Sequence, residues 1–209
     1  VGPNQTVNED AAAQTVNPWA TALSDGDPEL TQALSFVITA NSNAALFSTV
    51  PAVSPAGVLT YTPAANANGS ATITLRIQDD GSSTPPNVNT SATQTFTITV
   101  NPVNDAPTLT AVSPPTVLED AGAQTVANWA AFNPGPPDES GQTVLGYQIS
   151  ATSNPALFAV PPAVANNGTL TYTPAANANG SSSFVARVQD SGGSANGGVD
   201  LSVAQTFTI

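Results

Sequence analysis

The chain contains the stretch LTYTPAANANGS twice without a change, at residues 59–70 and again at residues 170–181. The landmarks around the two copies keep the same order, so that Trp19 recurs as Trp129 and Arg76 recurs as Arg187. The spacing of about 110 residues is the length of a whole domain and exceeds the roughly 20–50 residues of a solenoid repeat. The sequence therefore predicts one domain fold used twice, at residues 1–103 and 104–209, joined by a linker at about 101–107.

The strongest periodicity in each copy is two residues, which is typical of strands with one buried face. Apolar residues alternate with threonine and other polar residues over 72–78 and 95–100, and threonine suits the exposed face of a strand. Clusters of Pro, Gly, Asn and Asp separate these runs, and no segment has a convincing helical period. The first copy thus predicts seven strands, at about residues 3–8, 13–20, 33–40, 45–53, 57–62, 71–78 and 92–101.

Seven short, half-buried strands in about 100 residues are typical of two antiparallel sheets packed face to face. A hydrophobic content of 40% is enough to fill a core in each copy. We therefore expect an all-β fold of two tandem Ig-like (cadherin-like) seven-stranded Greek-key β-sandwiches.

The composition excludes several classes of protein. The 209 residues include 14 acidic side chains, two arginines and no lysine, which gives a net charge of −12. Such a surface repels nucleic acids and anionic membranes, so neither nucleic-acid binding nor membrane insertion is expected. The absence of cysteine and histidine excludes disulfides, thiolate or imidazole metal sites, and Ser-His-Asp or Cys-His catalysis. We expect no enzyme, and divalent cations are the better electrostatic match.

The expected strand directions assign each acidic loop to one end of its repeat. The downstream end of repeat 1 receives Glu9 and Asp10, which follow the first strand, and the linker residues Asn104 and Asp105. The upstream end of repeat 2 receives three further acids, so that the junction would gather seven residues: Glu9, Asp10, Asn104, Asp105, Asp138, Glu139 and Asp190. The remaining candidates fall at the upstream end of repeat 1 (Asp25, Asp27, Asp79 and Asp80) and at the downstream end of repeat 2 (Glu119 and Asp120).

Carboxylates crowded together without positive charge raise one another's pKa and destabilise a fold. A Ca²⁺ ion relieves this repulsion, because it accepts about 6–8 oxygen ligands in flexible geometry. The sequence therefore predicts Ca²⁺ at the junction, where it would stiffen the hinge. The alternative is that these acids are ordinary solubilising turn residues, since Asp and Asn favour such loops. Repeat 2 has Pro-Pro-Asp-Glu at 136–139 where repeat 1 has Asp-Gly-Asp at 25–27, and neither copy contains an EF-hand loop.

Three motifs together carry a family resemblance: NPVNDAP at 101–107, VNED at 7–10 and LTYTPA at 59–64. They resemble the cadherin-like, Ig-like tandem repeats of giant bacterial surface proteins of the adhesin type, and the likeness covers essentially the whole chain. Classical cadherins are a more distant likeness, in which an early Glu resembles Glu9 and Glu119 and an Asp-x-Asp element resembles residues 25–27. The resemblance implies β-sandwich repeats, export to the cell surface and service as an extender. It also implies that the chain is a piece of a longer array.

We therefore expect a structural spacer of a bacterial cell-surface adhesin, with neighbouring repeats of the same chain as its partners and Ca²⁺ as its cofactor. The alternative is a ligand-binding adhesion module that recognises a glycan or a host protein. Trp19 and Trp129 could stack on a sugar ring, but their repeated position before a turn favours core packing. The near-identity of the two copies favours spacing, because a binding head need not be duplicated.

Overall fold

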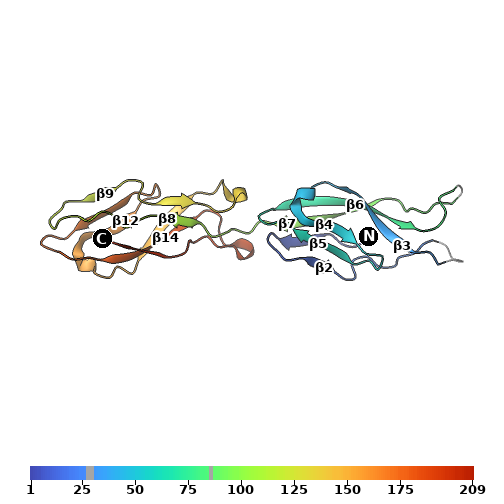
Figure 1. Cartoon of the computed structure of the whole chain (residues 1–209), viewed down its shortest axis with the longest axis horizontal. Helices are drawn as coiled ribbons and strands as arrows, with labels where there is room; N and C mark the ends of the chain where they lie inside the picture. Colours follow the sequence, from blue (N-terminus) through green and yellow to red (C-terminus); the bar gives the residue numbers. More distant parts are fainter. Residues whose placement is uncertain (27–30, 85–86) are drawn as a thin grey trace. The chain divides into compact units, whose positions relative to one another are not determined.

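The computed structural model describes residues 1–26, 31–84 and 87–209. The chain forms two compact units, Val1–Pro102 (unit 1) and Val103–Ile209 (unit 2), each of which is described by itself. Both units consist of strands joined by loops (Figure 1), which confirms the all-β prediction. In the described part of the chain the helical segments are three-residue 3-10 turns, and none is long and apolar enough to cross a membrane.

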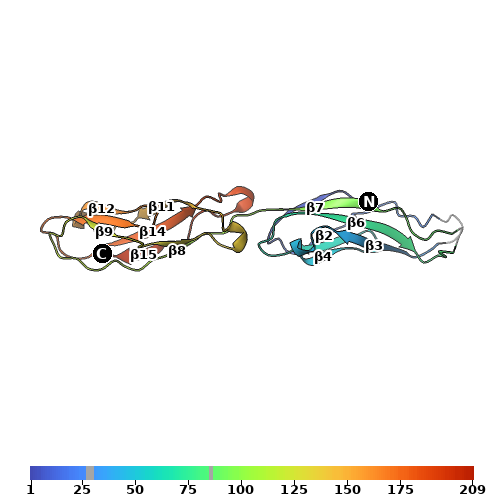
Figure 2. The same cartoon turned by 90° about the horizontal axis from the view of Figure 1, so that it is seen from above.

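Unit 1 is a sandwich of a four-stranded and a three-stranded sheet. Its strand order is β1-β7-β6-β3 in the first sheet and β2-β5-β4 in the second, and Figure 2 shows β6 and β7 in a different layer from β2 and β4. Strand β1 pairs parallel with β7, whereas the other pairs are antiparallel. The elements are β1 (Gln5–Asn8), β2 (Gln14–Val16), β3 (Leu34–Asn41), η1 (Ala44–Leu46), β4 (Phe47–Val53), β5 (Leu59–Pro63), β6 (Gly69–Asp79) and β7 (Gln94–Asn101).

Unit 2 repeats this architecture with one addition and one loss. Its sheets are β11-β14-β15 and β12-β13-β9, and a separate two-stranded ribbon joins β10 to β8. The predicted seven-strand scheme contains neither β8 nor β10, and the segment at 115–118, which corresponds to β1, forms no strand. The elements are β8 (Thr108–Thr110), β9 (Gln124–Val126), β10 (Ala131–Asn133), η2 (Pro137–Glu139), β11 (Val144–Ser150), η3 (Pro155–Leu157), β12 (Phe158–Val164), β13 (Leu170–Pro174), β14 (Ser183–Asp190), η4 (Ala195–Gly197) and β15 (Gln205–Thr208).

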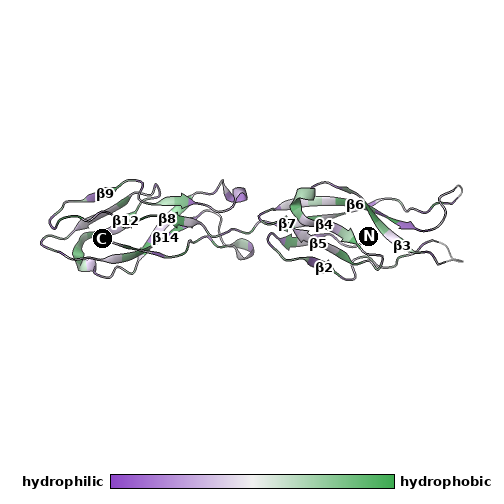
Figure 3. Ribbon diagram, viewed as in Figure 1, coloured by the Kyte–Doolittle hydropathy of each residue, from purple (hydrophilic) through white to green (hydrophobic). Residues whose placement is uncertain are grey.

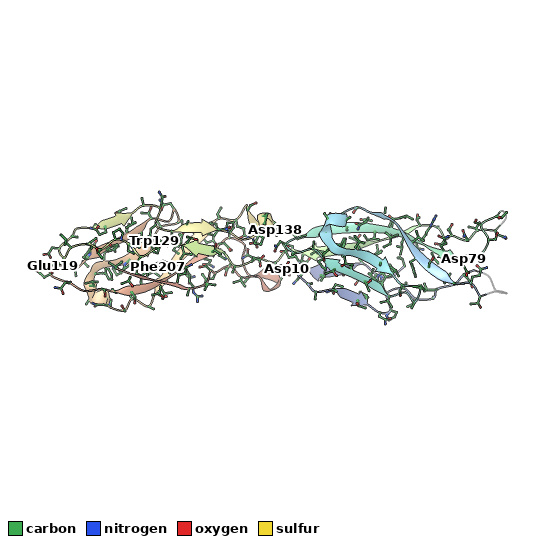
Figure 4. All side chains as sticks on the ribbon, viewed as in Figure 1. Asp10, Asp79, Glu119, Trp129, Asp138 and Phe207 are labelled. Atoms are coloured by element: carbon green, nitrogen blue, oxygen red, sulfur yellow. The ribbon has the colours of Figure 1, made fainter. Side chains whose placement is uncertain are left out.

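Each unit has its own core, built from the buried faces of its two sheets. The duplicated stretch forms β5 and β13, in which Leu59 and Leu170 are 0% exposed while the threonines between the apolar residues face outward or lie half-buried. Trp19 packs against Phe96 with 4.5 Å between ring centroids, and Trp129 packs against Phe207 at 4.8 Å (Figure 4). The strands accordingly carry most of the hydrophobic colour in Figure 3, and the loops at the ends of each unit are paler or purple.

Candidate cation site

Glu9 and Asp10 are held by the loop that follows β5 in unit 1. The Asn66 N–H donates to Asp10 Oδ1 at 2.9 Å, and Asn68 Nδ2 donates to Glu9 Oε2 at 3.2 Å. The Glu9 N–H donates to the Asn101 carbonyl at the end of β7. These residues therefore share one end of unit 1, as the strand order predicts.

Unit 2 repeats the same contacts at its own downstream end. The Asn177 N–H donates to Asp120 Oδ1 at 2.7 Å, and Asn179 Nδ2 reaches Glu119 Oε2 at 3.5 Å. Asp10 and Asp120 both have positive φ, 59° and 64°, as Asp and Asn tolerate in turns. Turn chemistry therefore accounts for the contacts of these two aspartates within their own units.

The acids at the upstream end of unit 1 also accept backbone hydrogen bonds. Asp25 Oδ2 accepts from the Gln32 N–H at 2.8 Å, Asp79 Oδ1 accepts from the Gly81 N–H at 2.8 Å, and Asp80 Oδ1 accepts from the Ala33 N–H at 2.9 Å. Asp25 and Asp79 line one pocket of about 260 Å³. Asp27 lies outside the described residues. Asp10 and Asp79 mark the two ends of unit 1 in Figure 4.

The corresponding end of unit 2 holds three buried polar candidate residues, Asn104, Glu139 and Asp190, whereas Glu9 is the buried one among the described candidates of unit 1. We call the group formed by Asn104, Asp105, Asp138, Glu139, Gln142 and Asp190 the Glu139 cluster. Glu139, at the end of η2, is 6% exposed, and Asp190, at the end of β14, is 0% exposed. The Asp105 N–H donates to Glu139 Oε1 at 2.6 Å. The side chain of Asp138 is exposed, and in Figure 4 it lies at the opposite end of unit 2 from Glu119.

Asn104 connects the cluster to the rest of unit 2. Its Nδ2 donates to both carboxylate oxygens of Asp190, at 3.1 and 3.4 Å, and to the Val199 carbonyl at 2.7 Å. Its Oδ1 accepts from Gln142 Nε2 at 2.5 Å, and its carbonyl accepts from the Val199 N–H at 2.7 Å. The linker residue Asn104 is therefore fixed on unit 2 by its backbone and by its side chain.

Two oxygen atoms of the cluster are buried without a hydrogen-bond donor: Glu139 Oε2 and Gln142 Oε1. Leaving a buried acceptor unsatisfied costs about 1–3 kcal/mol, and more for a charged group. Burial raises the pKa of Glu139 most strongly, the hydrogen bond from the Asp105 N–H lowers it, and the charges of Asp105, Asp138 and Asp190 raise it further. No hydrogen-bond donor among the described residues therefore reaches these two oxygens.

The donor set of the cluster suits a hard cation. Ca²⁺ is bound by carboxylate and amide oxygens and by water, and Glu139, Asp190, Asn104 and Gln142 offer such oxygens. Within residues 1–26, 31–84 and 87–209, however, no group of three or more Asp, Glu, His or Cys side chains is arranged as it stands to hold a metal ion. A cation bound by this cluster would therefore use the two unsatisfied oxygens, and amide oxygens as well as carboxylates.

Two residues of this site escaped the sequence analysis. Gln142 carries no charge and stands outside the acidic motif, so only its distance of three positions from Glu139 could have suggested it. Gly135 has a φ of 137°, and a Cβ at this position would clash with Glu139 Oε2. Glycine is therefore required where the chain passes the unsatisfied oxygen.

Both tryptophans belong to the core. Trp19 is 3% exposed and Trp129 is 6% exposed, and their Nε1–H groups donate to the carbonyls of Pro3 and Val112. Neither ring offers a face on which a sugar could stack.

Comparison with known proteins shows what the chain is similar to. A family model described as "Bacterial Ig domain" matches residues 1–101 and again residues 104–202. No curated protein matches the sequence significantly. The human CDH23 fragment EC21-23 superposes with a TM-score of 0.54 at 18% identity, covering 99% of this chain and 70% of that one. Human Protocadherin-24 EC1-2 superposes with a TM-score of 0.52 at 15% identity, covering 99% and 92%.

The adhesin InvE of Yersinia pseudotuberculosis also matches 99% of this chain and 56% of its own, at 18% identity. It superposes with a TM-score of only 0.27. At the identities of the two cadherin fragments, the likeness concerns the cadherin-like fold alone.

Proposed function

The chain belongs to the bacterial Ig domain family, with two members in tandem, and from this premise we propose that it is a spacer of a bacterial cell-surface adhesin, stiffened by Ca²⁺ at the residues that flank its linker. Bacterial Ig domains and cadherin-like domains are non-enzymatic adhesion folds, so a mechanical role accords with the family. The two copies share one scaffold, and each has its own core.

The observation that carries the calcium proposal is the pair of buried oxygens without donors, Glu139 Oε2 and Gln142 Oε1. A cation bound at either atom would satisfy it and offset the repulsion among Asp105, Asp138, Glu139 and Asp190. The chain has only two arginines and no lysine, so its own side chains can supply little of that positive charge.

The residues that would hold the ion are Glu139 and Asp190 through carboxylates and Asn104 and Gln142 through amide oxygens, with Asp105 and Asp138 adding charge. When bound, Ca²⁺ supplies positive charge and a rigid set of oxygen contacts. Asn104 and Asp105 belong to the linker, so holding them more tightly restricts the freedom of the chain between the repeats. Glu9 and Asp10 lie in unit 1, and a calcium-binding role for them is proposed within that unit.

The test is thermal unfolding of the whole chain in millimolar Ca²⁺ and in chelator. Ca²⁺ at about 100 times its dissociation constant would add about 2.7 kcal/mol to the free energy of unfolding, or about 10 °C or more in the melting temperature of a domain of this size. Asp105→Ala and Glu139→Gln should each reduce that rise. An unchanged melt in Ca²⁺, together with unchanged solution dimensions by small-angle scattering, would sink the proposal.

A module that recognises a glycan or a host protein stays the alternative. This alternative predicts saturable binding to a glycan or host-protein array, abolished when a half-buried aromatic residue such as Tyr147 is replaced. The burial of Trp19 and Trp129 does not favour it.

A further inference from the structure

The sequence contains four Asn-Gly pairs, at residues 68–69, 167–168, 179–180 and 196–197. An asparagine before glycine is open to spontaneous deamidation, because glycine has no side chain to hinder the approach of its backbone nitrogen to the asparagine side chain. The reaction passes through a five-membered ring, which needs space beside the glycine and a glycine nitrogen that can move. The surroundings of each pair therefore determine whether it can react.

The second pair, Asn167-Gly168, is shielded by its turn. The Gly168 N–H donates to the Ala165 carbonyl at 2.8 Å, and the Gly168 carbonyl accepts from the Ala130 N–H at 3.0 Å. A Cβ at Gly168 would clash with the Ala130 carbonyl oxygen. The side chain of Asn167 is engaged as well, because its Oδ1 accepts from the Thr169 N–H at 3.1 Å. The nitrogen that would attack is thus already donating, and the space for the ring is filled.

The first pair, Asn68-Gly69, has open surroundings. Both residues are exposed, and nothing lies within 4 Å of a Cβ built at Gly69. Gly69 is the first residue of β6, and the ends of elements open more readily than their interiors. Nothing lies within 4 Å of a Cβ at Gly180 or Gly197 either, so the other two pairs are also open. What distinguishes Asn68 is the buried acid that its side chain contacts.

The side chain of Asn68 faces the acidic turn that follows β1. Its Nδ2 donates to Glu9 Oε2 at 3.2 Å, and Glu9 is 5% exposed. Asp10, the next acid of the turn, is held by the same loop through the Asn66 N–H. The amide nitrogen of Asn68 is the group that deamidation removes. A carboxylate in its place would stand against the buried carboxylate of Glu9.

We propose that Asn68 is a site of spontaneous deamidation, and that the reaction weakens unit 1 by turning an amide–carboxylate contact into a contact between two carboxylates. The Gly69 backbone nitrogen attacks Asn68 Cγ and loses its proton. The Cγ–Nδ2 bond breaks, and the amide nitrogen leaves with that proton as ammonia. Water then opens the succinimide at either carbonyl, which leaves aspartate or isoaspartate at position 68. Glu9 loses a hydrogen-bond donor and gains a like charge beside it.

The experiment incubates the whole chain in mildly alkaline buffer with chelator and samples it over time by tryptic digestion. Trypsin cuts after lysine and arginine, so it yields three peptides, residues 1–76, 77–187 and 188–209. We expect isoaspartate and the mass gain of deamidation to accumulate at Asn68, located by fragmentation. Asn167 can react only after the hydrogen bonds of Gly168 open, so its rate should be at least about tenfold lower. Equal rates at the two asparagines, or an unchanged Asn68, would overturn the proposal.

Matched variants separate the reaction from its consequence. Asn68→Gln keeps an amide on a longer side chain, which disfavours the five-membered ring, so its 1–76 peptide should stay unmodified. Asn68→Asp carries the aspartate product from the start. It should lower the folded-to-unfolded ratio of unit 1 about tenfold or more in chelator, because the hydrogen bond to the Glu9 carboxylate is lost. Denaturant unfolding followed by Trp19 fluorescence in a Trp129→Phe background measures this ratio. Asn167→Asp adds the same charge to unit 2 and should leave the ratio unchanged. Equal ratios in Asn68→Asp and its parent would contradict the proposed weakening.

Discussion

Glu139 is an acidic residue whose surroundings disfavour its charged form. One carboxylate oxygen accepts a short hydrogen bond from the Asp105 N–H, and the other is buried without any donor. The charged form is disfavoured by burial, and the acids around it add repulsion. A residue placed in this way is unfavourable for stability by itself, which is why we connect it with a cation.

The raised pKa of Glu139 predicts a pH dependence of stability in chelator. Because the folded state holds this proton more tightly than the unfolded chain, stability is fullest below the unfolded pKa of about 4 and falls as the pH rises through the folded pKa. Denaturant unfolding over this pH range should show a decline in the free energy of unfolding of the wild type. Glu139→Gln should lack this decline. Ca²⁺ should suppress the decline, since it stabilises the ionised form. Parallel pH profiles of the two proteins would contradict this account.

The backbone conformation and surroundings of Gly135 predict a loss of stability when this glycine is replaced. A Cβ there would meet Glu139 Oε2, and the φ of 137° is unfavourable for any side chain. Gly135→Ala should lower the free energy of unfolding of unit 2 by about 1–3 kcal/mol, measured by denaturant unfolding. Gly180→Ala is the matched control, because Gly180 has a similar φ of 124° and nothing lies within 4 Å of a Cβ at that position. Equal losses in the two variants would show that the contact with Glu139 is not the cause.

At the scale of elements, the duplicated stretch is a strand followed by a loop that the acids of the preceding turn hold in place. Asp10 accepts from Asn66 in unit 1 exactly where Asp120 accepts from Asn177 in unit 2. The loop ends at Gly69 and Gly180, whose φ values of 123° and 124° require glycine. This pairing supplies a physical reason for the recurrence of Glu-Asp and of Asn-Ala-Asn-Gly together.

Asp10→Ala and Asp120→Ala should therefore have similar effects. Each removes an acceptor from a loop N–H and should cost its own unit about 1 kcal/mol, as measured by denaturant unfolding in chelator. Asp10→Asn and Asp120→Asn each keep an acceptor oxygen and are the controls. They should retain most of the stability that the alanine variants lose. A much larger effect of Asp10→Ala that appears only in Ca²⁺ would instead indicate that Asp10 contributes to the cation site.

At the scale of the whole molecule, the chain is two units with separate cores, and each core contains one of its two tryptophans. Each unit can therefore be followed separately by fluorescence. In Trp19→Phe the remaining signal reports unit 2, and in Trp129→Phe it reports unit 1.

We expect the rise in melting temperature caused by Ca²⁺ to be larger for the Trp19→Phe reporter, because the unsatisfied oxygens of the Glu139 cluster lie in unit 2. Comparing each variant with itself, in Ca²⁺ and in chelator, cancels the cost of the core substitution. A rise in melting temperature seen only in the Trp129→Phe reporter would mean that the main cation site is formed by the acids of unit 1.

The sequence by itself determined the duplicated all-β architecture and the end of each unit at which every described candidate acid lies. It did so because alternation along a strand and the antiparallel order of strands are local or repeated patterns. Only the tertiary structure revealed the β8–β10 ribbon, the role of Gln142 and the two oxygens without donors. The contacts concerned join residues 34, 38 and 86 positions apart, between Asp105 and Glu139, Asn104 and Gln142, and Asn104 and Asp190. Whether a buried oxygen finds a donor depends on how such distant segments pack, and no local pattern records it.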